Sequence, residues 1–88
     1  MKKLGYLEIS SVLFTAELES YENLNNQELI WLLRSEVPEE RAIAAKLLGE
    51  REAIIALPYI CNTLAIEKEK YISIIMSEAL IHLTAGHR

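Results

Sequence analysis

The sequence predicts an all-α protein of about five helices. Apolar residues recur at steps of three and four along most of the 88-residue chain, which is the spacing of one helical face. Helix-capping residues stand where these runs begin, and only three glycines and two prolines interrupt them. Segments of similar pattern also recur at a fixed distance. Because the length suits one modest core, we predict a single helical-repeat domain over residues 1–88.

Residues 1–24 are predicted to form an N-terminal helix. Tyr6, Ile9, Leu13 and Ala16 would share one face of it, although the apolar run from position 9 to position 14 would also suit a strand. A single strand would have no partner in an otherwise helical chain, and an unpaired edge is costly. The helix is therefore the preferred interpretation.

The next two helices carry clear boundary signals. Asn25 can accept a hydrogen bond from the N3 amide while Glu28 reaches back to the Asn25 amide, which predicts a capping box. This helix should run to about Ser35. Pro38 suits the first turn of the following helix, where its missing N–H is harmless, and Gly49 suits that helix's end.

Two more helices should follow. The fourth is predicted from Arg51 to about Ile66, with a kink at Pro58 because proline removes a backbone hydrogen bond inside a helix. Cys61 would be a small core residue on its buried side, together with Ile54, Leu57 and Leu64. The fifth, from about Lys70 to Thr84, has the cleanest amphipathic pattern in the chain.

A repeat relates the two halves of this helical region. Leu48 aligns with Leu80 at an offset of 80 − 48 = 32 residues, and other apolar and small positions match at the same offset. The sequence therefore predicts two helical hairpins in register, residues 25–49 and residues 50–85. Together with the N-terminal helix they would form a right-handed α-α superhelix.

The segment PEERAIAAKLLGE resembles the second helix of HEAT repeats, in particular the short HEAT-like units also found in phycobilisome lyases. The residues that carry the resemblance are Arg41, Ala44, Ala45, Leu48 and Gly49. It covers residues ~25–84 and implies stacked antiparallel helix pairs that serve as scaffolds and binding surfaces. Fold alone does not supply a function.

The resemblance is incomplete at two positions. The family usually places an aspartate in the turn before the arginine, but this chain has no aspartate and Glu36 is at best a substitute. Ser73 stands where the second repeat would have its arginine. We therefore expect the polar ladder that joins successive repeats to be absent.

The charge pattern argues against nucleic acid. The net charge is −4, and no lysine or arginine occurs between Lys3 and Arg34, a stretch that contains five glutamates. Such a surface repels phosphate backbones. Two alternatives remain open: a HEAT-like protein that binds nucleic acid, and a small acidic inhibitor or immunity-type protein whose Glu17, Glu19 and Glu22 mask a basic target.

Location is predicted from cysteine and hydropathy. The single Cys61 allows no intrachain disulfide, and no apolar stretch approaches the ~20 residues that cross a bilayer. Glu8 interrupts the apolar run after the N-terminal lysines, which argues against a secretion signal. We expect a cytoplasmic protein that does not enter a membrane.

No residue pattern predicts catalysis, a cofactor or a metal. Cys61 has no base or cation on its stripe, and no Ser-His-Asp set exists without an aspartate. Glu78 and His82 lie four residues apart and could supply half of a metal site, but a helix-surface ion pair is the preferred interpretation. The chain is not expected to be an enzyme.

The predicted functional surface is apolar. The last helix carries a second apolar stripe opposite its core face, and the fourth helix carries another; the predicted interface residues are Tyr71, Ile74, Ile81, Ala85, Ile55 and Tyr59. The chain's own elements could bury these residues. Otherwise they indicate a noncatalytic protein-interaction module that binds a homo-oligomer partner or another protein, mainly through the C-terminal helix.

Overall fold

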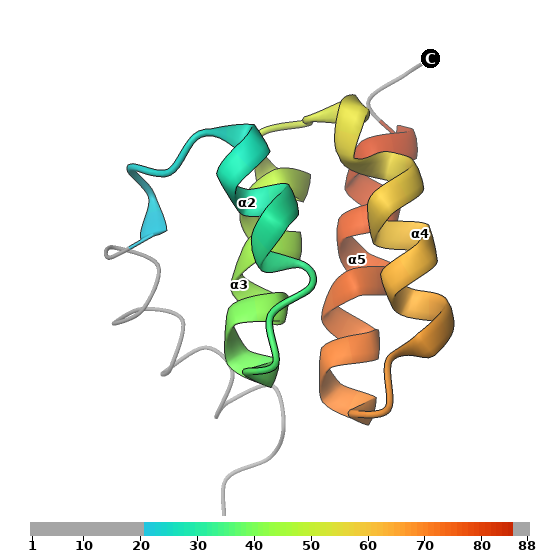
Figure 1. Ribbon diagram of the computed structural model, residues 1–88. Coiled ribbons are helices and arrows are strands. Elements are labelled where there is room, and N and C mark those ends of the chain that lie inside the picture. Colours follow the sequence, from blue (N-terminus) through green and yellow to red (C-terminus); the bar gives the residue numbers. More distant parts are fainter. Residues whose placement is uncertain (1–20, 86–88) are drawn as a thin grey trace, which may run out of the picture.

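The computed structural model describes residues 21–85, and the fold they form is all-α, as predicted (Figure 1). Its elements are α2 (Asn26–Leu32), α3 (Pro38–Glu50), the 3₁₀ turn η1 (Ile54–Ala56), α4 (Leu57–Ile66) and α5 (Lys70–Ala85). No strand occurs within this range. The predicted N-terminal helix lies almost wholly outside the described residues. No helix within residues 21–85 has the length and apolar content needed to cross a bilayer.

The four helices form two antiparallel hairpins, α2–α3 and α4–α5, that stand side by side (Figure 1). The second helices, α3 and α5, pack along each other at the centre, while α2 covers α3 and α4 covers α5. The largest fully buried side chains come from all four helices: Leu29, Leu33, Ile43, Leu48, Ile60, Ile72, Met76 and Leu83. One continuous core therefore joins the hairpins.

Gly49 lets α3 and α5 approach closely. A Cβ atom at this position would lie 2.9 Å from the Cα of Ala79. The prediction that Gly49 ends its helix is wrong, because α3 continues to Glu50 and the left-handed residue is Glu52, with φ 53°. The amide of Glu52 donates to Gly49 O and that of Ala53 to Leu48 O, both at 3.0 Å, which completes a Schellman cap.

The helix starts follow the sequence signals. The predicted capping box is present: Asn25 Oδ1 accepts from the Glu28 amide and Glu28 Oε1 accepts from the Asn25 amide, both at 2.8 Å. Pro38 opens α3, as predicted. Pro58 instead lies in the first turn of α4, so the predicted interior kink is wrong. The Glu52 turn and η1 delay the start of the helix until Leu57.

The predicted buried face of α4 is also wrong. Cys61 is exposed, whereas Ile60 is fully buried. The starts of α3 and α5, Pro38 and Lys70, are 70 − 38 = 32 residues apart, but buried Ile60 follows buried Leu29 by 60 − 29 = 31. One residue turns a helix by ~100°, and this moves Cys61 from the core to the surface.

Candidate functional site

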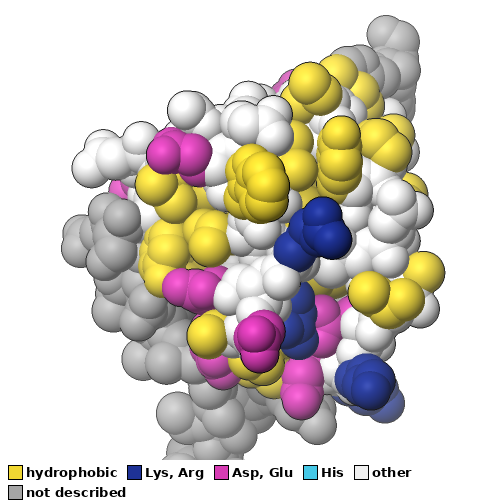
Figure 2. All heavy atoms as spheres, viewed as in Figure 1, with side chains coloured by type: hydrophobic (Ala, Val, Ile, Leu, Met, Phe, Trp, Pro, Cys, Tyr) yellow, Lys and Arg dark blue, Asp and Glu magenta, His cyan; other side chains and the backbone are white. Residues whose placement is uncertain are grey.

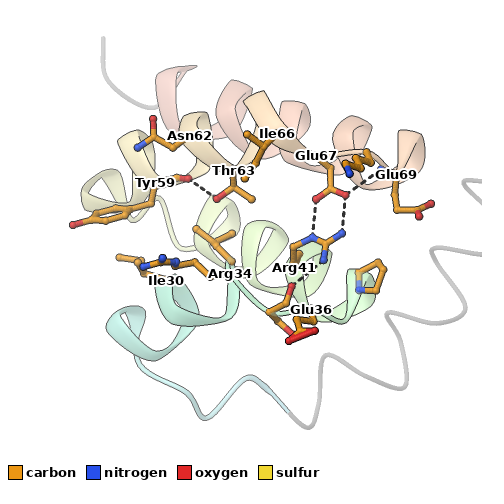
Figure 3. A pocket seen from close by; sticks show the side chains of 14 residues that line it. Ile30, Arg34, Glu36, Arg41, Tyr59, Asn62, Thr63, Ile66, Glu67 and Glu69 are labelled. Carbon is orange, nitrogen blue, oxygen red and sulfur yellow. Dashed lines mark hydrogen bonds and ion pairs between the residues drawn. The ribbon is translucent and has the colours of Figure 1, made fainter.

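A groove of about 820 Å³ opens between α2 and α4 (Figure 3). It exists because α3 and α5 pack closely while α2 and α4 make at most sparse contact. One wall consists of Ile30, Leu33 and Arg34 in and after α2, and the other of Tyr59, Asn62, Thr63 and Ile66 on α4. Concave ligand sites in proteins commonly have volumes of roughly 300–1,000 Å³.

One end of the groove is closed by an ion pair between the hairpins. Arg41 on α3 donates from Nε to Glu67 Oε1 at 2.7 Å and from Nη2 to Glu67 Oε2 at 2.8 Å. Its Nη1 also donates to the backbone oxygen of Ser35 at 2.8 Å, and the Glu67 side chain is only 1% exposed. This hydrogen bonding lowers the pKa of Glu67 and raises the pKa of Arg41.

The expected absence of a polar link between the hairpins is therefore wrong. Glu67 begins the turn before α5 and lies 32 residues after Ser35, which occupies the turn before α3. The partner of Arg41 comes from the following hairpin's turn and not from Glu36. The sequence signal was present in the charged turn IEKEK, but only the spacing of both turns from Arg41 could have pointed to Glu67.

Arg34 is the charged residue at the other end of the groove. Within residues 21–85 its guanidinium has no hydrogen-bond or ion-pair partner, although it lines the groove. Figure 3 shows it near Tyr59 of the opposite wall, away from Glu36 and Glu69. Thr63 is already engaged, because its hydroxyl donates to Tyr59 O at 2.8 Å. This end thus offers an unpaired cation among apolar side chains.

Other polar contacts join elements and leave little for chemistry. Glu40 accepts hydrogen bonds from the hydroxyls of Ser35 and Tyr21, and these lower its pKa. Tyr71 Oη donates to Glu39 Oε2 at 2.9 Å, which ties α5 to the first turn of α3. Burial and this bond raise the pKa of Tyr71 to about 12. Within residues 21–85, no three metal-ligating side chains come together.

The six predicted interface residues do not form one site. Ile74, Ile81 and Ala85 are exposed on α5, and Ile55 and Tyr59 are exposed on η1 and α4, but only Tyr59 lines the groove. Tyr71 is half-buried against the core and hydrogen-bonded to Glu39, so it offers less free surface than predicted.

Exposed apolar side chains extend beyond the predicted set. Trp31 is 67% exposed and Ile66 77% exposed. Figure 2 shows hydrophobic side chains concentrated on the upper part of the α2–α4 face and charged ones below. Sequence reasoning missed Trp31 because it follows directly after the core residues of a short helix.

Glu78 and His82 are both exposed on α5, and they form no ion pair with each other. The expected pair is therefore wrong. Within residues 21–85 the Glu78 carboxylate has neither a hydrogen-bond partner nor an ion-pair partner.

No protein-family model, curated protein or solved structure matches this chain. The resemblance to HEAT repeats therefore stays a prediction, and the function has to be argued from the surfaces described above.

Proposed function

We propose that this chain is a noncatalytic protein-interaction module that self-associates through its exposed apolar side chains. The observation that carries the proposal is the number of large apolar residues left on the surface of so small a fold. Eight are exposed: Trp31, Val37, Ile54, Ile55, Tyr59, Ile66, Ile74 and Ile81. Scattered apolar residues are normal on protein surfaces, but contiguous ones usually mark an interface.

The position of α5 supports this proposal. In a stack of helical hairpins the final helix normally presents a polar outer face, because no further repeat covers it. Here α5 carries Ile81, 64% exposed, and Ile74, 39% exposed, on the face opposite its core residues. A second copy of the chain is an occupant of fixed composition that could cover both.

The first test compares the wild type with the double variant Ile74→Glu/Ile81→Glu. Two carboxylates in place of two apolar side chains should lower the mass measured by light scattering to that of a single chain, since charges are costly to bury in an interface. Helicity measured by circular dichroism should stay unchanged, because neither side chain belongs to the core.

A matched control adds the same charge without removing apolar surface. Asn23→Glu/Thr84→Glu changes two exposed polar residues and should keep the wild-type mass. If the wild type is already a single chain throughout the measured concentrations, the proposed self-association is wrong. The same conclusion follows if the Ile74/Ile81 variant associates as strongly as the control.

A further inference from the structure

We infer that the outer face of α5 of one copy docks into the α2–α4 groove of another copy, with Glu78 pairing with Arg34. This inference rests on the proposed self-association and assigns the two surfaces that meet. It joins two features that are otherwise unexplained: a carboxylate without a partner between exposed isoleucines, and a guanidinium without a partner in an apolar groove.

The docking face of α5 consists of Ile74, Glu78 and Ile81. The two isoleucines are seven residues apart, which places them on the same side of the helix about 10 Å from each other. Glu78 lies between them, four residues after one and three before the other. It is exposed, and within residues 21–85 it has no ionic or hydrogen-bond partner.

The groove repeats this spacing. Tyr59 and Ile66 on α4 are also seven residues apart, hence about 10 Å, and they are 50% and 77% exposed. Arg34 comes from the facing wall, where the described residues leave it unpaired. Two apolar contacts at matching distances, with opposite charges between them, make the two surfaces complementary in both pattern and charge.

Charge also selects this arrangement over others. Because the chain carries a net charge of −4, two copies repel each other unless a local pair of opposite charges orients them. A guanidinium binds a carboxylate through two parallel hydrogen bonds, and such a bond gains strength when apolar neighbours exclude water. Ile74, Ile81, Tyr59 and Ile66 would provide that exclusion.

The two surfaces differ, so the contact is heterologous. Each copy retains one free groove and one free α5 face after docking, and association continues into rings or open chains. A symmetric dimer, in which α5 meets α5, would stop at two copies. This difference in stoichiometry makes the inference testable.

The charge test uses Arg34→Glu, Glu78→Arg and the variant that carries both substitutions. Each single variant places like charges opposite each other and should weaken self-association at least about 30-fold in sedimentation experiments. The variant with both restores an opposite pair and should associate again. Lys70→Glu and Glu22→Arg make the same charge changes at other exposed positions and should behave as the wild type.

The stoichiometry test mixes Arg34→Glu with Ile74→Glu/Ile81→Glu. The first keeps an intact α5 face and the second an intact groove, so one contact can form and the mixture should yield a complex of two chains and nothing larger. Circular dichroism of each variant verifies that it is folded.

The inference is overturned if the wild type self-associates but the Arg34 and Glu78 variants behave as their controls, or if the variant with both substitutions does not recover. Self-association through α5 would survive that result. Failure of the mixture to form a two-chain complex also overturns the head-to-tail contact. A wild type that stays a single chain refutes the proposed function itself, whichever other protein occupies the groove.

Discussion

Arg41 and Glu67 form the polar link between the hairpins among the described residues. Their side chains meet at one end of the groove, where Glu67 is almost completely buried and the guanidinium also holds the Ser35 backbone oxygen. Removing one member of such a pair leaves a buried charge without compensation, which is why isolated changes at buried pairs are costly. The pair fixes the turn before α5 against α3.

Acid sensitivity should reveal this pair. The pKa of Glu67 is lowered in the folded protein, so its contribution to stability is fully present above the unfolded pKa of about 4.3 and is lost as the pH falls through the folded pKa. In urea titrations, Glu67→Gln should lose about 2 kcal/mol at pH 7 and should decline less than the wild type on acidification. The two curves should approach each other at low pH.

Glu50→Gln is the control, because Glu50 is half-exposed and pairs only with Lys46 at the helix surface. Its stability should follow that of the wild type at every pH. A Glu67→Gln curve parallel to the wild-type curve would show that Glu67 carries none of the acid sensitivity.

At the scale of helices, the sequence predicted starts better than faces. The capping box at Asn25 and the proline that opens α3 are local signals, because each is formed by residues within one turn. The buried side of α4 depends on where the helix begins after the Glu52 turn, and no pattern inside α4 specifies that. With apolar residues all round α4, a shift of one residue was enough to place Cys61 wrongly in the core.

The α3–α5 contact makes a prediction at the same scale. Gly49→Ala should destabilise the fold by about 1–3 kcal/mol, because the added Cβ meets the backbone of Ala79 and overpacked interfaces cost that much. The sign is informative, since alanine in an exposed helix position is favoured over glycine by about 1 kcal/mol.

Glu50→Ala at the neighbouring exposed position should change the free energy of unfolding by less than about 0.5 kcal/mol in the same urea titrations. A Gly49→Ala variant as stable as the wild type or more so would contradict the close approach of α3 to α5.

For the whole molecule, the sequence predicted the all-α class and exposed apolar stripes but not the groove. The groove depends on how far α2 and α4 diverge once α3 and α5 are in contact, and helical periodicity contains no such information. Arg34 and Glu78 had no visible role in the sequence for the same reason. Only the fold shows that one lies in an apolar groove and the other between two exposed isoleucines.

The central claim is that these surfaces serve to bind another copy of the chain. Light scattering of the unmodified protein over a hundredfold range of concentration tests it most directly. Head-to-tail docking predicts a mass that rises steadily with concentration, beyond that of two chains. A constant mass of 10.0 kDa over the whole range would contradict the claim.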